Sequence, residues 1–202
     1  MTTSIHFIVV VILIYMITIN AAAISATVTT LTPPKFPAII VFGDSTVDTG
    51  NNNYIKSLFK ANMPPYGENF PGHVPTGRFS YGKLVPDFIA SFLRIKDEVP
   101  PFLKPTLSEN ELRTGVSFAS AGSGFDDLTT RVSNVIPVSK QVDMFKSYVE
   151  KLNGVVGKDK AKNIIGEALV IISTGTNDFV FNFFDIPTRR LEFDIDGYQL
   201  KK

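Results

Sequence analysis

The chain has 202 residues, of which 44% are hydrophobic and 11% aromatic, enough apolar side chain for one folded core. A formal net charge of +1 excludes the broad positive surface that nucleic acids or anionic lipids would need. The absence of cysteine excludes disulfides, a thiol nucleophile and cysteine-based zinc sites. We therefore expect a single domain held together by packing alone.

The N-terminus is typical of a secretory signal peptide. Residues 7–19 are apolar throughout, which is too short a run to span a bilayer comfortably, and a small-residue Ala-x-Ala site ends at Ala23. The residues before this run contain no Lys or Arg, so an uncleaved anchor is the alternative. We predict a signal peptide over 1–23, a linker rich in Thr and Pro over 24–37, and the domain over 38–202.

Three short apolar runs lack alternating polar residues, a pattern typical of strands in a parallel sheet covered on both faces. They are residues 38–42, 116–120 and 168–172. We predict helices over 54–60, 84–93, 139–155 and 158–167, and in the third of them Val142, Phe145, Val149 and Leu152 fall on one face. We expect Ser139 to cap the third of these helices, and the Pro-rich stretches 62–79 and 99–112 to be loops. Because ligands bind beyond the carboxyl ends of parallel strands, the loops that follow the three strands should meet at one edge.

Each of these three loops carries a residue suited to acyl transfer. Ser45 can present a hydroxyl nucleophile, Gly122 a backbone N–H that approaches a substrate oxygen, and Asn177 a side-chain amide. Each residue type alone is common in ordinary turns. Their order along the chain, with one residue after each predicted strand, indicates the nucleophile and donors of a serine esterase, which is half of such a site. Asp44 and Asn51 to Asn53 are expected to bond nearby backbone groups.

Four stretches carry a resemblance to a known family. They are FGDSTVDTGNNN at 42–53, PTGRFS at 75–80, FASAGSG at 118–124 and GTND at 175–178. Together they resemble the blocks of the plant GDSL-type esterases/lipases of the SGNH hydrolase superfamily, over essentially the whole chain after the signal peptide. The resemblance implies a flavodoxin-like three-layer α/β/α fold with a parallel central sheet. It also implies secretion to the extracellular space or cell wall, and ester hydrolysis without a metal or cofactor.

Carried over by position, the resemblance implies that Ser45 is the nucleophile and also donates a backbone N–H to the oxyanion hole. Gly122 and Asn177 would be the other two donors. The implied partner is an ester substrate, with simple acyl esters, lipids, cutin-like polyesters and acetylated glycans all open. We expect no nucleic-acid partner, and no stable membrane span once the signal peptide has been cleaved. Four phenylalanines after the third block are expected to be core, with an acyl groove as the alternative: Phe179, Phe181, Phe183 and Phe184.

The chain departs from the family pattern at the residue that serves as the catalytic base. The family uses a histidine in an Asp-x-x-His motif near the C-terminus, and these 202 residues contain no such motif. The two histidines are His6, in the signal peptide, and His73, which has Phe70 rather than Asp three residues before it. We therefore interpret the chain as C-terminally truncated, with a fold incomplete at that end and the 168–172 strand as an apolar sheet edge.

Smaller departures affect no catalytic position: they are Thr46, Ser117 and Tyr81, where the family usually has Leu, Asn and Asn. Two alternatives follow from the missing base, an inactive truncated isoform and a non-catalytic protein that binds an ester or glycan. A metal-dependent adhesion loop built on Asp44, Thr46 and Asp48 is a weaker alternative. A phosphate-binding loop is weaker still, because no Gly-Lys-Ser/Thr follows the strand.

Overall fold

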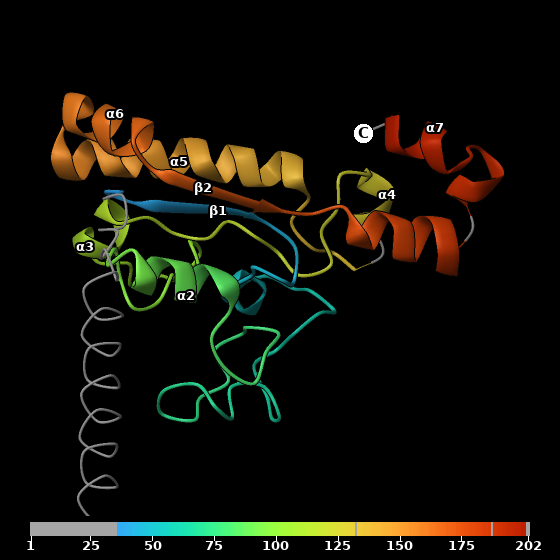
Figure 1. The fold of residues 1–202 in the computed structure, drawn as a ribbon, viewed down its shortest axis with the longest axis horizontal. Helices are drawn as coiled ribbons and strands as arrows, with labels where there is room; N and C mark the ends of the chain where they lie inside the picture. The colour runs from blue at the N-terminus through green and yellow to red at the C-terminus, as the bar shows by residue number, and fades with distance from the viewer. Residues whose placement is uncertain (1–35, 132, 187, 201–202) are drawn as a thin grey trace, which may run out of the picture. The chain divides into compact units, whose positions relative to one another are not determined.

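The computed structural model describes residues 36–131, 133–186 and 188–200. The predicted signal peptide, His6 and most of the predicted linker lie outside these residues. The elements in chain order are β1 (Ile39–Gly43), η1 (Asn51–Tyr54), α2 (Val85–Phe92), α3 (Glu109–Arg113), α4 (Asp127–Arg131), α5 (Val138–Val156), α6 (Lys158–Gly166), β2 (Leu169–Ser173), η2 (Asp178–Asp185), η3 (Arg189–Leu191) and α7 (Ile195–Leu200) (Figure 1). Within the described ranges, no helix has the length and apolar character needed to cross a membrane.

The sheet is parallel and has helices on both faces. β1 and β2 pair in register from Ile39 opposite Leu169 to Gly43 opposite Ser173. Successive side chains of a strand point to opposite faces, so β1 contributes to two cores. Ile40 belongs to a cluster with residues of α5 and α6, whereas Ile39 belongs to a cluster with Ala90 of α2. Figure 1 shows α5 and α6 on one side of the sheet and α2 on the other, as an α/β/α arrangement requires.

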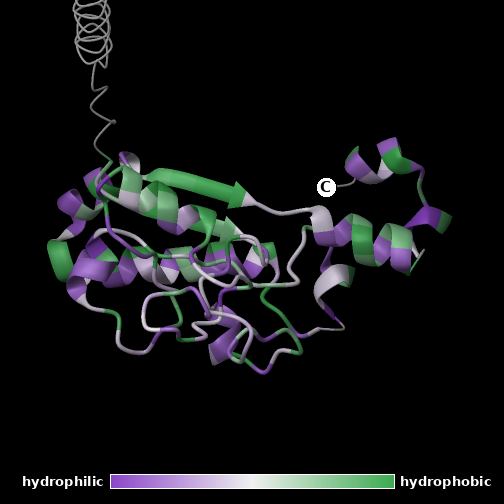
Figure 2. Ribbon diagram, turned by 60° about the horizontal axis from the view of Figure 1, so that its bottom comes forward, coloured by the Kyte–Doolittle hydropathy of each residue, from purple (hydrophilic) through white to green (hydrophobic). Residues whose placement is uncertain are grey.

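β2 is an edge strand among the described residues, and it is hydrophobic along its length (Figure 2). Leu169 and Ile171 pack against the cluster on the α2 side. On the opposite face Val170 is 51% exposed and Ile172 is 65% exposed. The predicted exposed apolar edge is therefore confirmed for the alternate residues that face away from α2.

The predicted strand over 116–120 is wrong as a strand, although the segment does lie beside β1. Ser117 forms isolated bridges, one of them with Val41, instead of a continuous ladder. On the other side of the segment, Asn51 Nδ2 donates to the carbonyls of Ser117 and Ala119, each at 2.8 Å. The Ser117 carbonyl also accepts from the N–H of Phe102 at 2.9 Å, so an isolated bridge and a side-chain amide occupy the side where a further strand would have paired.

The longer predicted helices are confirmed as α2, α5 and α6. The predicted helix over 54–60 is wrong, because Ile55 adopts an extended conformation that ends η1. The expected loop over 99–112 contains the start of α3, where Ser108 and Glu111 form a capping box. Ser139 is not the cap of α5: Pro137 occupies that position, and its fixed φ begins the helix without a side-chain bond.

Candidate active site

The loops that carry Ser45 and Gly122 are joined by one buried side chain of α5. Gln141 accepts a hydrogen bond from the N–H of Gly43 at 2.8 Å and donates to the carbonyl of Gly43 at 2.8 Å. The same Nε2 donates to Ser123 Oγ at 3.2 Å. Gln141 is fully buried. It therefore fixes the end of β1 against the loop that contains Gly122.

The third loop joins the same arrangement through Asn177. Its Nδ2 donates to the carbonyl of Ser123 at 2.8 Å. At the end of β2, the carbonyl of Ser173 accepts from the N–H of Asp44 at 3.0 Å. The structure thus brings together the three segments that hold Ser45, Gly122 and Asn177, as the parallel sheet predicts.

Ser45 lies half-buried in a turn shaped by its neighbour Asp44. The Asp44 carboxylate accepts from the N–H of Thr46 at 3.0 Å and from Thr46 Oγ1 at 2.8 Å. Thr46 Oγ1 also lies 2.8 Å from Ser173 Oγ, so the turn is held to β2 as well. The prediction that Asp44 is a structural hydrogen-bonding residue is confirmed.

Gly122 occupies a position that only glycine fills without strain. The N–H of Ser123 donates to the carbonyl of Ser120 at 3.0 Å, and Gly122 has φ +86°. A positive φ at the third residue is the geometry of a type II turn. A Cβ on Gly122 would also lie 2.4 Å from a ring atom of Phe59. The turn therefore presents bare backbone at the end of the 116–120 segment beside β1.

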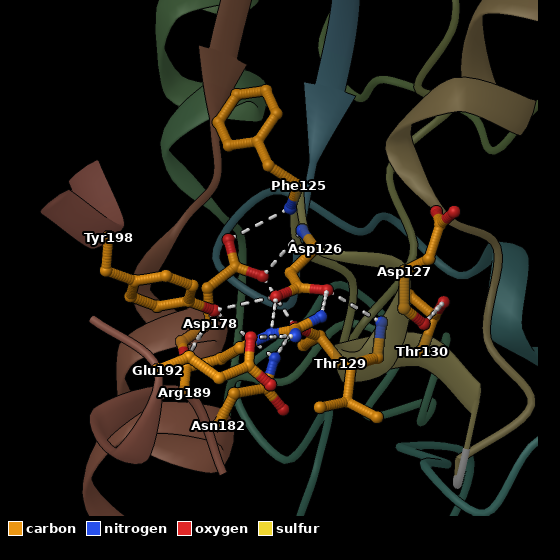
Figure 3. Close-up of polar contacts among 11 residues, drawn as sticks. Phe125, Asp126, Asp127, Thr129, Thr130, Asp178, Asn182, Arg189, Glu192 and Tyr198 are labelled. Atoms are coloured by element: carbon orange, nitrogen blue, oxygen red, sulfur yellow. Dashed lines mark hydrogen bonds and ion pairs between the residues drawn. The ribbon is translucent and has the colours of Figure 1, made fainter. Parts of the chain in front are cut away.

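Asp178 anchors the Asn177 loop, a role that the sequence analysis did not assign to it. Its buried carboxylate accepts from the N–H groups of Phe125 at 2.9 Å and Asp126 at 3.0 Å, and from Thr129 Oγ1 at 2.5 Å (Figure 3). A Cβ on Gly124 would lie 2.1 Å from this carboxylate. The only sequence signal was the acidic residue of GTND, which is equally typical of a turn.

Asp126 extends this network to the C-terminal elements. It accepts from Arg189 Nε at 2.6 Å, Arg189 Nη2 at 2.9 Å and the Tyr198 hydroxyl at 3.2 Å (Figure 3). Burial acts to raise the pKa of Asp126, but the hydrogen bonds and charge of Arg189 outweigh it and lower this pKa to about 2. The ion pair therefore fixes η3 and α7 near the start of α4.

Asp48 is the buried carboxylate beneath the Ser45 loop. Its Oδ1 accepts from the N–H groups of Gly50 and Asn51 at 2.8 Å each, and its Oδ2 from that of Ala121 at 2.9 Å. Burial raises the pKa of Asp48 to about 6, against the lowering effect of these backbone bonds. Because both oxygens face N–H donors, Asp48 does not suit the cation of the adhesion-type alternative.

Neither a base nor a metal site appears at the strand ends in the described part of the chain. His73 Nδ1 lies 2.5 Å from the carbonyl oxygen of Glu68 in an exposed loop. Across residues 36–131, 133–186 and 188–200, no three His, Asp or Glu side chains gather in a way that could hold a metal ion.

A small apolar pocket of about 150 Å³ lies beside η2. Its lining residues are Leu58, Phe59, Leu128, Thr129, Ser133, Phe181, Asn182 and Ile186. Phe59 stacks on Phe181 with ring centroids 6.1 Å apart, and the same Phe59 ring packs against Gly122. Phe183 is buried as predicted for a core residue, whereas Phe184 is 55% exposed.

Fold and site together define an α/β protein in which a serine loop and an asparagine loop follow two parallel strands, and a glycine turn follows the segment beside β1. Residues 39–196 match the family model described as GDSL-like Lipase/Acylhydrolase. The chain belongs to this family.

Its curated relatives include proteins of Arabidopsis thaliana. GDSL esterase/lipase At1g06990 is 62% identical over 172 residues, covering 85% of this chain and 48% of the relative. GDSL esterase/lipase At2g30310 is 59% identical over 170 residues, covering 83% of this chain and 47% of the relative. The chain thus spans about half the length of these relatives. No solved structure matched the chain.

Proposed function

We propose that this protein is a secreted serine esterase/lipase that hydrolyses carboxylic esters through Ser45. One observation carries the proposal: Gln141 and Asn177 both bond Ser123, and this brings the Ser45, Gly122 and Asn177 loops to one sheet edge. The relatives named esterase/lipase support the reaction class.

In the proposed reaction, Ser45 Oγ attacks the ester carbonyl carbon and the C=O electron pair moves onto oxygen. The oxyanion accepts from the backbone N–H groups of Ser45 and Gly122 and from Asn177 Nδ2. An amide NH₂ carries two protons, so Asn177 can bond the Ser123 carbonyl with one and the oxyanion with the other. One such donor contributes a factor of roughly 10² to 10³ to the rate.

The proton of Ser45 requires a base, and water must later cleave the acyl-enzyme. In the family pattern this base is the histidine of Asp-x-x-His, which the 202 residues do not contain. Nucleophile and oxyanion hole without the base retain only about 10³- to 10⁴-fold catalysis over water. The alternative function is binding of an ester or acetylated glycan without turnover.

Added imidazole separates the two functions, because imidazole can accept the proton of Ser45. We expect the protein to hydrolyse p-nitrophenyl butyrate faster as imidazole is added, by more than imidazole alone accounts for. Ser45→Ala should abolish the excess, and Ser139→Ala, an exposed serine of α5, should keep it. Ester binding in both Ser45 forms, with no excess turnover in either, would instead establish the binding function.

Secretion is tested separately. We expect the protein recovered from the medium of expressing plant cells to begin at Ile24, after the predicted cleavage site. Retention in the cell membrane with Met1 or its neighbours still present would favour the uncleaved anchor.

A further inference from the structure

The Ala121–Gly122 peptide is the middle peptide of the turn that presents the proposed oxyanion donor. Type I and type II turns differ by a rotation of this middle peptide through about 180°. In a planar trans peptide the C=O and N–H point in opposite directions. The direction of the Gly122 N–H is therefore set by whatever holds the carbonyl of Ala121.

That carbonyl is held by Asn52. Asn52 Nδ2 donates to the Ala121 oxygen at 3.0 Å and to the Phe59 oxygen at 3.1 Å. The Asn52 Oδ1 accepts from Ser120 Oγ at 2.5 Å, which fixes the side of the amide that faces the turn. Asn52 is 1% exposed, so water does not compete for these bonds.

The preceding peptide of the turn is held as well. The N–H of Ala121 donates to Asp48 Oδ2 at 2.9 Å. With Asp48 on its N–H and Asn52 on its C=O, Ala121 is bonded at both ends by side chains of the loop that follows Ser45. The nucleophile loop thus orients the backbone of the oxyanion loop.

We infer that Asn52 is a positioning residue for the oxyanion hole: by holding the carbonyl of Ala121, it keeps the N–H of Gly122 directed toward the substrate oxygen. This inference rests on the proposed function for its catalytic consequence. The orientation of the peptide itself can be measured without any turnover.

The sequence allows the peptide to be observed alone. Ala121-Gly122 is the only Ala-Gly pair in the chain. Protein labelled with carbonyl-¹³C alanine and ¹⁵N glycine therefore gives one carbonyl-to-amide correlation signal by NMR, and that signal comes from this peptide. Loss of the bond to the carbonyl should shift its ¹³C resonance, and turn flipping should broaden or split the ¹H–¹⁵N resonance.

Asn52→Ala removes the donor, and Ser120→Ala keeps the donor but removes the group that orients it. Asn53→Ala is the matched control, because Asn53 Nδ2 bonds Thr76 at 3.0 Å and does not contact the turn. We expect Asn52→Ala to displace or broaden the signal strongly, Ser120→Ala to do so more weakly, and Asn53→Ala to leave it in place.

The kinetic readout is the imidazole-assisted, Ser45-dependent hydrolysis of p-nitrophenyl butyrate. Asn52→Ala should lower kcat about 10- to 100-fold with KM unchanged, less than the roughly 10²- to 10³-fold loss from removing a donor outright. Ser120→Ala should give a smaller kcat loss in the same direction.

Two results would overturn the inference: a signal unaffected in Asn52→Ala and Ser120→Ala, or a displaced signal with kcat unchanged. If the wild type shows no Ser45-dependent turnover, the proposed function fails. The NMR signal then decides alone whether Asn52 holds the peptide.

Discussion

The side-chain amide of Gln141 pairs with both peptide groups of Gly43, 98 residues earlier in the chain. A primary amide has the same donor and acceptor as a backbone peptide, so Gln141 completes the end of β1 as a neighbouring strand would. The Gly43 carbonyl also accepts from the N–H of Ser120 at 3.0 Å. The last residue before the Ser45 turn is therefore fully bonded.

Gln141→Leu should destabilise the protein more than any exposed change in α5. Leucine has a similar volume but leaves the N–H of Gly43 without its partner and the Gly43 carbonyl with one bond fewer. We expect the free energy of unfolding to fall by about 2–5 kcal/mol in urea denaturation. Glu150→Gln, at an exposed position of the same helix, should change the free energy of unfolding by less than about 0.5 kcal/mol. An equal change in the free energy of unfolding in Gln141→Leu and Glu150→Gln would show that the bonds between Gln141 and Gly43 contribute nothing to stability.

The buried ion pair between Arg78 and Asp87 should be costly to break. Arg78 is 4% exposed and Asp87 is 0% exposed, and the guanidinium donates to both carboxylate oxygens at 2.8 Å. Either Arg78→Met or Asp87→Ala leaves a buried charge unpaired, so we expect a loss of about 3–5 kcal/mol from each.

The control for this ion pair is the exposed pair of Arg113 with Glu109 on α3. Arg113→Met should cost no more than about 1 kcal/mol in the same urea titration. The double variant of Arg78 and Asp87 should lose less than the sum of the two single variants, because it leaves no unpaired charge. A loss in the double variant equal to the sum of the two single losses would contradict an energetic coupling between Arg78 and Asp87.

Two glycine-to-alanine substitutions should change the free energy of unfolding in opposite directions. Gly122→Ala combines a positive φ with a contact of 2.4 Å to Phe59, so we expect a loss of about 2–5 kcal/mol. Gly154 lies within α5 and has no atom within 4 Å of an added Cβ, so Gly154→Ala should gain about 0.5–1 kcal/mol. The melting temperatures of the two variants give the comparison directly. A stable Gly122→Ala variant would mean that the turn is free to relax.

Stability should fall in acid through Asp126. Burial raises the pKa of Asp126, but hydrogen bonding to Arg189 lowers it to about 2 from an ordinary value of 3.8. The unfolded chain therefore binds a proton first as the pH drops. The stabilisation is complete above about pH 4 and is lost between about pH 4 and pH 2. Because the pair is partly solvated, we expect the loss to be about 1–2 kcal/mol.

Arg189→Met should flatten this acid dependence, since the carboxyl then loses its main partner. Arg190→Met is the matched control, because Arg190 is exposed and adjacent in the chain. Urea titrations at pH 2, 3, 4 and 6 measure the slope in each variant. An unchanged slope in Arg189→Met would assign the acid sensitivity to other carboxylates.

The sequence predicted the three loops of the candidate site but not the side chains that hold them together. The order of the three loops along the chain and the parallel sheet place Ser45, Gly122 and Asn177 at one edge. Gln141 and Asp178 gave no comparable signal. Gln141 lies in an otherwise amphipathic helix, and its role depends on a partner 98 residues away.

Local sequence patterns by themselves determined both strands and the helices α2, α5 and α6. The apolar runs that become β1 and β2, and the helical periodicity of α5, are short-range properties that the fold preserves. Only the tertiary structure decided the fate of 116–120, because its side away from β1 is bonded by an isolated bridge to Pro101 and by Asn51, 66 and 68 residues away. Side-chain amides from distant segments replace strand pairing here, and their partners exist only after the chain has folded.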